Sequence, residues 1–296
     1  MWSRISSLCL AASLACGQER IEAFQTCMGT QFRVTVYAVD IRGAQQAIAR
    51  AFARAAELDA KLSDYREDSE LNQLCRTRRM RVSDDLRRVL EYSQRVARES
   101  DGAFDITLGP FIRLWRESRL KRTLPSPQQI AEARTRTGYR KIILRRIEVF
   151  LAAPAMQLDL GGIAKGFAAS EMLRVLRDAG FPQSLVAAGG DLAIGDPPPG
   201  RTAGWRVELG ATGEVRDLSR CSVSTSGDES QYVEINGVRY SHIIDPRTGL
   251  GLMKSLPITV IAAEGMEADA LATALQVRPG AAKMLARKHP SARFKL

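Results

Sequence analysis

Asp159-Leu160-Gly161-Gly162-Ile163-Ala164-Lys165-Gly166 is the stretch of this 296-residue chain that says most about its fold and chemistry. The apolar residues 156–160 predict a strand, and the residues from about Ile163 predict a helix. Two glycines between them remove Cβ atoms where a ligand or a second backbone would come close. The first N–H groups of the helix and its partial positive charge would point at the same place, as in phosphate sites. The alternative is a tight strand-to-helix turn without a ligand, and the stretch alone leaves both open.

Working outward, strands and helices mix with short hairpins. Apolar and polar residues alternate over 31–38, which predicts a half-buried strand, and Asn236-Gly237 between two alternating runs predicts a type I′ hairpin. Further strands are predicted over 141–144, 147–151, 184–187, 205–209 and 257–263, and helices over 44–62, 84–101, 163–179 and 266–277, with a short one from Ser126. Because the hairpins are antiparallel, we expect an α+β fold of mixed, mainly antiparallel sheets flanked by helices, rather than a doubly wound parallel sheet.

The first 16 residues differ from the remainder. Arg4 precedes a short uncharged apolar run that ends in small residues before Cys16. The run is far shorter than the ~20 apolar residues of a membrane-spanning helix, so it predicts a secretory signal over 1–16. Ser13-Leu14-Ala15-Cys16-Gly17 also resembles a lipoprotein processing box, in which Cys16 would carry a lipid. The alternative is a cytosolic start with a buried apolar helix. We expect an exported protein at the periplasmic or cell-envelope face of the inner membrane, with one domain over 17–296.

The net charge is +10, with 45% hydrophobic and 26% charged residues, as in a soluble globular protein. Lysines and arginines are spread through the predicted helices, without a long basic block or a basic stripe interleaved with aromatic residues. We therefore expect no nucleic-acid partner. Attraction to a diphosphate ligand or to an anionic membrane surface is sufficient to explain the charge.

One candidate cluster lies near the end of the predicted hairpin, where His242 precedes the turn Asp245-Pro-x-x-Gly249. A histidine can take a proton near neutral pH, which suits it to activate a hydroxyl nucleophile. The alternative is a histidine with structural partners beside an Asp-Pro turn, since aspartate commonly opens such turns.

A second cluster places Asp269 and Thr273 four residues apart, hence on one helix face. A carboxylate and a hydroxyl are too few ligands for a closed calcium site, but they suit Mg²⁺, which keeps waters and borrows phosphate oxygens. The alternative is an acid favoured by the helix dipole and a threonine bonded to its own turn.

Several enzyme classes lack their motifs in this chain. There is no G-x-S-x-G elbow, no H-E-x-x-H, no Walker A lysine and no G-x-G-x-x-G turn. The sequence therefore does not favour a hydride-transfer Rossmann enzyme, a zinc hydrolase or a P-loop kinase.

Taken in order, these clusters resemble the bacterial ApbE family of FAD:protein FMN transferases. Each motif is weak alone, but eight in the right order are specific. The resemblance rests on Met28-Gly29-Thr30, Leu62 to Tyr65 with Ser69-Glu70-Leu71, Gly102 to Asp105, Asp159 to Gly166, Ala188 to Asp191, Ser224 to Gly227, His242 to Gly249, and Asp269 to Thr273.

The resemblance implies that FAD is bound as the substrate. Tyr65 and Phe104 would offer stacking surface to flat rings, Asp105 and Asp159 would accept hydrogen bonds from ring or ribose donors, and Lys165 would offset diphosphate charge. The full implied set of FAD-binding residues is Met28, Tyr65, Ala103, Phe104, Asp105, Asp159, Lys165 and Ile244.

It also implies Mg²⁺, held by Asp269 and Thr273 with backbone or nearby groups around Gly162, Ala164 and Ala272. Some relatives have a hydroxyl residue at the position of Gly162 and an acid at that of Lys165. In this chain Gly162 supplies only backbone oxygen, and Lys165 cannot bind a metal as a carboxylate.

The predicted function is transfer of the FMN part of FAD to a threonine or serine hydroxyl of a partner flavoprotein, with release of AMP. His242 and Asp269 are the predicted catalytic residues. One alternative is Mg²⁺-dependent hydrolysis of FAD to FMN and AMP by the same residues. Another, from a different class, is a non-catalytic exported FAD-binding protein.

Overall fold

The computed structural model describes residues 17–227, 232–254 and 256–295. The predicted signal over 1–16, with Cys16, lies outside the described residues. The largest sheet has seven strands in the order β1-β2-β6-β7-β10-β13-β14, and every neighbouring pair in it is antiparallel. The predicted α+β fold is therefore confirmed. The strands are β1 (Glu19–Cys27), β2 (Thr30–Ala38), β6 (Ser184–Ala188), β7 (Asp191–Ile194), β10 (Cys221–Ser226), β13 (Ile258–Ala262) and β14 (Arg293–Lys295).

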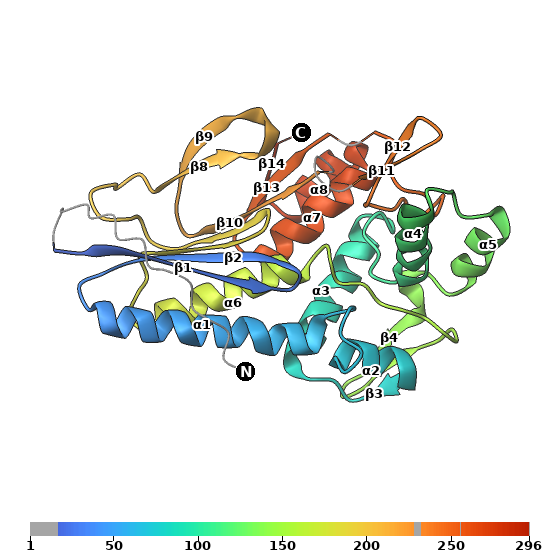
Figure 1. Cartoon of the computed structure of the whole chain (residues 1–296), viewed down its shortest axis with the longest axis horizontal. Helices are drawn as coiled ribbons and strands as arrows, with labels where there is room; N and C mark the ends of the chain where they lie inside the picture. The colour runs from blue at the N-terminus through green and yellow to red at the C-terminus, as the bar shows by residue number, and fades with distance from the viewer. Residues whose placement is uncertain (1–16, 228–231, 255, 296) are drawn as a thin grey trace.

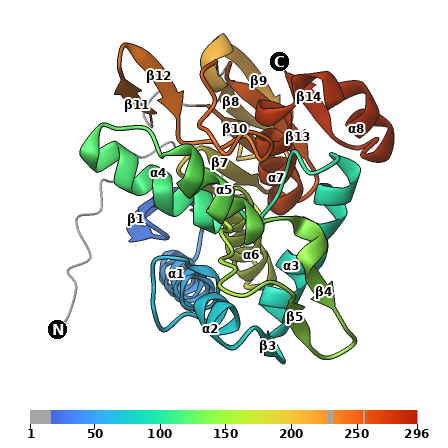
Figure 2. The ribbon, with the colours of Figure 1, turned by 90° about the vertical axis from the view of Figure 1, so that its right-hand side faces the viewer.

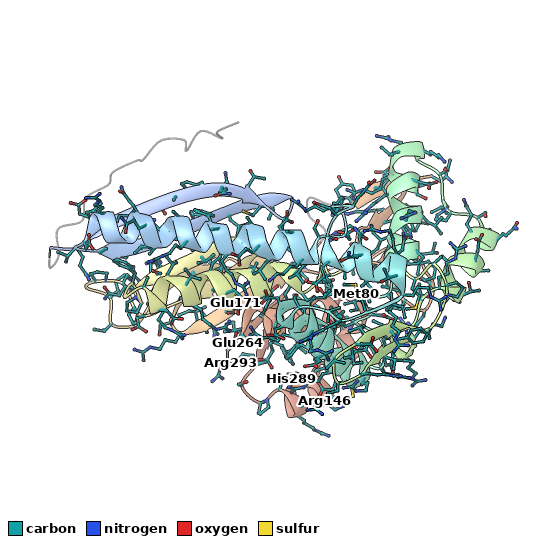
Figure 3. All side chains as sticks on the ribbon, turned by 90° about the horizontal axis from the view of Figure 1, so that it is seen from below. Met80, Arg146, Glu171, Glu264, His289 and Arg293 are labelled. Atoms are coloured by element: carbon teal, nitrogen blue, oxygen red, sulfur yellow. The ribbon has the colours of Figure 1, made fainter. Side chains whose placement is uncertain are left out.

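Three helices, α1 (Ile41–Leu62), α6 (Ala164–Asp178) and α7 (Gly265–Val277), cover one face of this sheet (Figure 1). Helices α1 and α6 lie side by side under it (Figure 3). Apolar residues of α1 recur every three or four positions, and burying them fixes which face of the helix meets the sheet. Next to α7 lies α3 (Asp84–Glu99), and α8 (Ala282–Lys288) follows α7 after a short 3₁₀ turn. Apolar residues of both helices join the same large core.

The hairpin of β8 (Trp205–Leu209) and β9 (Glu214–Leu218) covers the opposite face, as the end-on view shows (Figure 2). Its alternating residues Trp205, Val207 and Leu209 pack into a second apolar cluster with the sheet residues Ile194 and Val223. The large sheet is thus buried on both sides by different structures.

Helices and a hairpin from distant parts of the chain form a third apolar cluster, around Phe111, Trp115 and Tyr240. Its elements are α4 (Gly109–Lys121), α5 (Pro127–Thr135), β11 (Tyr232–Ile235) and β12 (Val238–Ser241). The remaining elements are α2 (Glu70–Thr77), a three-stranded sheet of β3 (Arg79–Met80), β5 (Val149–Leu151) and β4 (Ile142–Leu144), and the short 3₁₀ turns Tyr139–Lys141, Gly210–Thr212 and Pro279–Ala281.

The predicted type I′ hairpin is confirmed, because Asn236 and Gly237 both have positive φ, at 53° and 75°. The predicted strand over 156–160 is wrong. Leu158 N donates to Cys75 Sγ at 3.4 Å and Asp159 N donates to Ile106 O at 2.8 Å, so a side chain and a loop take the hydrogen bonds that a strand would give to a neighbour. The segment enters the glycine turn without joining a sheet.

Among the described residues, none of the helices combines the length and the apolar character that crossing a membrane requires.

Candidate active site

A cavity of about 1,110 Å³ collects the predicted site residues. Its walls come from α6 and α7, the loop before α2, the segment 103–108, α4, and the end of β12. Of the predicted residues only Ala272 is absent from the lining, because it is fully buried on α7 between Asp269 and Thr273. The others line it: Met28, Tyr65, Ala103, Phe104, Asp105, Asp159, Gly162, Ala164, Lys165, His242, Ile244, Asp269 and Thr273.

The glycine turn leads into α6 as predicted, with the helix beginning at Ala164. Asp159 Oδ1 accepts from Gly161 N at 2.8 Å, and Ile163 N donates to Leu160 O at 3.0 Å, which closes the turn. Ile163, the N-cap residue, makes no side-chain cap bond, but Ala164 N donates to Leu160 O at 2.9 Å and Gly166 N donates to a carboxylate of α7. The start of α6 therefore offers the cavity mainly its partial positive charge.

Glycines also let the first turns of α6 and α7 touch. A Cβ at Gly166 would lie 2.2 Å from Gly265 O, and a Cβ at Gly265 would lie 2.0 Å from Gly166 O. Gly166 N donates to Asp269 Oδ2 at 3.2 Å across this contact. The close approach places the α7 face that carries Asp269 beside the start of α6.

The same approach brings Thr273 against the glycine turn, because a Cβ at Gly162 would lie 2.8 Å from Thr273 Oγ1. Glycine at position 162 thus leaves room for the hydroxyl of Thr273 next to the backbone of the turn.

Lys165 lies among carboxylates at the floor of the cavity. Its Nζ donates to Gly161 O at 2.9 Å and lies 3.5 Å from Asp191 Oδ2 and 3.9 Å from Asp269 Oδ2. Burial opposes its charge, but Asp269 and Asp191 together hold the pKa of Lys165 above its usual value. The floor therefore contains one ammonium group and an excess of carboxylate.

Two carboxyl groups of the cavity, those of Asp269 and Asp159, have raised pKa values. Burial, followed by the charge of Asp191, raises the pKa of Asp269 to about 7. Burial, followed by the charge of Asp64, raises the pKa of Asp159 to about 6. Shifted pKa values of this kind cluster at functional sites.

The oxygen donors of Asp269 and Thr273 fit Mg²⁺, a hard cation that takes its other ligands from backbone, waters and phosphate oxygens. Within the described residues, no group of three or more His, Cys, Asp or Glu side chains could hold a metal ion by itself.

Asp105 lies in the cavity wall, and both of its carboxylate oxygens accept hydrogen bonds from neighbouring residues of the wall. Oδ1 accepts from Thr107 N and Thr107 Oγ1 at 2.8 and 2.7 Å, and Oδ2 accepts from Tyr139 N at 2.9 Å. Burial raises the pKa of Asp105. These bonds fix the segment that carries Ala103 and Phe104.

His242 is exposed at the rim of the cavity, directly after β12. The turn after it forms as predicted for an Asp-Pro turn, with Asp245 Oδ1 accepting from Arg247 N at 2.9 Å. Trp115 Nε1 donates to Gly249 O at 2.9 Å, which ties this loop to α4. The loop therefore has a structural role for Asp245 and leaves His242 within reach of solvent.

Asp191 is one of the cavity residues that the sequence-based prediction of site residues missed. It is 3% exposed, begins β7 and contacts Lys165. It closes the Ala188-Gly189-Gly190-Asp191 motif, so the signal was present in the sequence. Its proximity to Lys165 and Asp269 depends on the packing of α6 on the sheet, which the motif does not encode.

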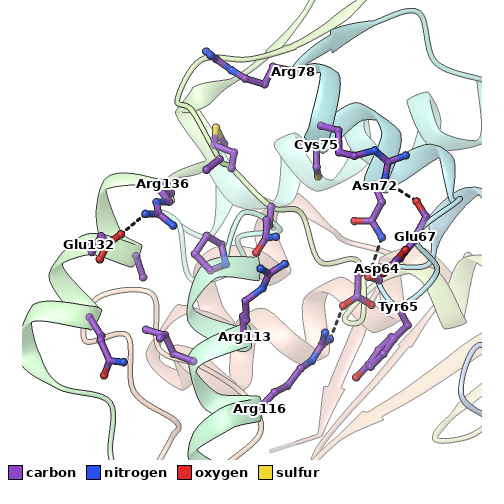
Figure 4. A pocket seen from close by; sticks show the side chains of 18 residues that line it. Asp64, Tyr65, Glu67, Asn72, Cys75, Arg78, Arg113, Arg116, Glu132 and Arg136 are labelled. Atoms are coloured by element: carbon purple, nitrogen blue, oxygen red, sulfur yellow. Dashed lines mark hydrogen bonds and ion pairs between the residues drawn. The ribbon is translucent and has the colours of Figure 1, made fainter.

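A second cavity of about 920 Å³ adjoins the first and shares Asp64, Tyr65 and Arg116 with it. Five arginines and three carboxylates line it (Figure 4). The arginines are Arg76, Arg78, Arg113, Arg116 and Arg136, and the carboxylates are Asp64, Glu67 and Glu132.

Comparisons with known proteins agree on one family. The model of the ApbE family matches residues 28–294. A FAD:protein FMN transferase of Klebsiella pneumoniae (strain 342) is 34% identical over 267 residues, which cover 84% of this chain and 76% of that protein. One of Salmonella typhimurium is 32% identical with the same coverage. The apo crystal structure of Pseudomonas stutzeri flavinyl transferase ApbE superposes with a TM-score of 0.82 at 30% identity, over 94% of this chain and 91% of that one.

Proposed function

Because the chain belongs to the ApbE family, we propose that it is a FAD:protein FMN transferase, which moves the FMN part of FAD onto a partner protein. The observation that carries this proposal is the cavity itself. Residues that are spread in sequence from Met28 to Thr273, and that the family resemblance assigns to FAD or metal, line one space of about 1,110 Å³. That space is slightly larger than the ~300–1,000 Å³ usual for small-molecule sites, so it has room for a large ligand.

In the proposed reaction, a threonine or serine hydroxyl of the acceptor attacks the phosphorus on the FMN side of FAD. A new P–O bond forms to the hydroxyl oxygen, the bond from this phosphorus to the bridging oxygen breaks, and AMP leaves with that oxygen. His242 takes the hydroxyl proton. The exposure of His242 supports this role, because the acceptor is a protein and its hydroxyl must reach the base from solvent.

The floor of the cavity would receive the diphosphate. Lys165 and the positive end of the α6 helix dipole supply positive charge there. Asp269 and Thr273, with backbone near Gly162, Ala164 and Ala272, would hold Mg²⁺, which when bound offsets negative charge on phosphate oxygens.

AMP release tests the proposal. The purified protein is incubated with FAD and Mg²⁺, with and without an acceptor flavoprotein. A transferase gives AMP together with a fluorescent flavin band on the denatured acceptor. AMP and free FMN without acceptor would instead support the hydrolase, and FAD binding with no AMP under any condition would support a non-catalytic binding protein.

His242→Ala tests the base. We expect the rate of flavin transfer to fall by about 100-fold or more at saturating Mg²⁺, because general bases contribute ~10²–10⁴-fold. Unchanged affinity for FAD would separate the loss of a base from the loss of a binding contact. Transfer at the wild-type rate would show that His242 is not the base.

The proposal extends to export through residues 1–16 and to lipid attachment at Cys16. The apolar run and the Ser13 to Gly17 box support it. The test is the mass of the N-terminal peptide of the protein recovered from membranes. A diacylated or triacylated Cys16 is expected, and an unmodified N-terminus near Cys16 would exclude the anchor.

A further inference from the structure

Tyr65 presents an open ring to the cavity. It lies in the loop between α1 and α2, and 76% of its surface is exposed. One face of the ring is covered by the guanidinium of Arg116, which lies 4.0 Å from the ring centroid. An exposed aromatic ring held on one face is a stacking surface for a flat ligand on the other.

Arg116 reaches this ring from α4 and also pairs with two carboxylates. Its Nη2 lies 2.5 Å from Asp64 Oδ2 and 3.6 Å from Asp159 Oδ2 (Figure 4 shows the pair with Asp64). Asp64 directly precedes Tyr65, and Asp159 directly precedes the glycine turn. One guanidinium thus joins the loop that carries Tyr65 to the segment that leads into α6.

The planar shape of arginine suits this double task. A guanidinium can stack on a ring with its face while its edge donates to carboxylates, whereas the ammonium of lysine is a point charge that does neither in a fixed geometry. Arg116 also compensates the repulsion between the carboxylates of Asp64 and Asp159. The charge of Asp64 raises the pKa of Asp159, whereas the charge of Arg116 lowers it. Without Arg116, Asp64 and Asp159 would face each other with less compensation.

We propose that Arg116 is a positioning residue that holds Tyr65 as a platform, so that a flat ring of FAD stacks on the face of Tyr65 opposite the guanidinium. This inference rests on the proposed function, since it takes FAD as the ligand. The stack would contain three layers, namely the ligand ring, the Tyr65 ring and the Arg116 guanidinium.

The first test measures FAD binding by quenching of flavin fluorescence in EDTA, where turnover is prevented. For Arg116→Met we expect about tenfold weaker binding, because the Tyr65 ring loses the stacked guanidinium and its loop loses the ion pairs made by Arg116. Arg116→Lys should restore little of the loss, since lysine keeps the charge but not the planar stack. In steady state, the KM for FAD should rise by a similar factor while kcat changes little, which is the signature of lost binding rather than lost chemistry.

The matched control is Arg113→Met. Arg113 lies one turn earlier on α4, lines only the arginine-lined cavity, and makes no ion pair with the described residues. The substitution removes the same charge from the same helix without touching Tyr65. We therefore expect the affinity of this variant for FAD to be close to that of the wild type. An equal loss in both variants would show that general attraction to anionic FAD is at work, and would overturn the proposal.

A double-mutant cycle with Tyr65→Leu tests the stack directly. If Arg116 acts through Tyr65, Arg116→Met should change FAD affinity less than threefold once the ring is gone. The same tenfold loss in that background would mean that Arg116 acts without Tyr65, and so would overturn the proposal. Wild-type affinity in Arg116→Met would do the same. Failure of the wild type itself to bind FAD would instead overturn the proposed function.

Discussion

Two clusters of buried charge lie along helix α6, and their carboxylates behave in opposite ways. Beside Glu171, in the middle of the helix, Asp85 is held by Arg54 through two hydrogen bonds of 2.9 and 2.5 Å and by Lys61 at 2.6 Å. Arg54, despite the opposing effect of burial, helps lower the pKa of Asp85 to about 2. At the first turn, Asp269 and Asp191 share the single ammonium of Lys165, and the pKa of Asp269 rises to about 7. Burial contributes most to the raised pKa of Asp269, and the charge of Asp191 adds to it. The clusters also differ in charge balance, since the first pairs its carboxylates with cations and the second has two carboxyl groups for one ammonium.

The largest expected effect comes from removing the charge of the second cluster. Asp269→Asn should lower the rate of FMN transfer by at least about 100-fold, because a charge that stabilises the metal and the phosphate is lost. The melting temperature of the metal-free protein should stay equal or rise, since the variant relieves repulsion with Asp191. AMP release and thermal unfolding measure the two quantities. A transfer rate within tenfold of the wild type would contradict the difference drawn between the clusters.

The reverse pattern is expected for Asp85→Asn in the first cluster. Arg54 and Lys61 would lose their partner in a mostly buried place, which should cost about 3 kcal/mol of unfolding free energy. The transfer rate per folded molecule should not change, because Asp85 lies outside the cavity lining. Urea unfolding together with AMP release checks both parts.

Asp84→Asn is the matched control for that experiment. Asp84 is the exposed neighbour in the same first turn of α3, so its removal should cost only a few tenths of a kcal/mol through the helix dipole. If Asp84→Asn were as destabilising as Asp85→Asn, the cost would come from the helix end and not from the ion network.

The first cluster shows what the sequence could not predict. The spacing of apolar residues predicted α1 and α3 with their buried faces, because that periodicity is local. Arg54, Asp85 and Glu171 lie far apart in the chain, and only the packing of three helices brings them together. Asp269 and Thr273 could be predicted as a pair for the opposite reason, since four residues on one helix fix their distance.

The two histidines also show that contacts between distant parts of the chain cannot be predicted from local sequence. His242 was predicted as a site residue and lies at the cavity rim. His289, labelled in Figure 3, is 1% exposed. Its Nδ1 lies 2.6 Å from Glu267 and its Nε2 2.9 Å from Glu99, so it joins α7 and α3. A histidine has the same chemistry in either place, and the packing of distant helices decides which one a substrate can reach.

The stability of the protein should depend on pH in opposite ways through the two clusters. This effect should be smaller than those of the substitutions above. The pKa of Asp269 is raised from 3.8 to about 7 on folding, so its contribution is present below pH 3.8 and is lost as pH rises through 7. In EDTA, the wild type should therefore gain stability relative to Asp269→Asn as pH falls from 8 to 5, by at most about 1.4 kcal/mol per pH unit.

Asp85 should give the opposite result. Its pKa is lowered from 3.8 to about 2, so its contribution is present above pH 3.8 and is lost as pH falls through 2. The difference in stability between the wild type and Asp85→Asn should be constant from pH 8 to 5 and shrink below pH 4. Melting curves of the three proteins across pH 3 to 8 measure both trends, and parallel trends would show that the two carboxylates are in similar surroundings.

The smallest expected effect tests how much Lys61 and Arg54 each contribute to stability through their contacts with Asp85. Lys61 contacts Asp85 from a side chain that is 33% exposed, whereas Arg54 holds both oxygens of Asp85 and also Glu171 from one that is 19% exposed. Water screens the lysine more, and Asp85 keeps its two arginine hydrogen bonds when the lysine is removed. Lys61→Met should therefore cost less than about 1 kcal/mol in urea unfolding, near the range of exposed pairs. A cost as large as that of Asp85→Asn would show that both cations are needed, and that the cluster is balanced more narrowly than its distances indicate.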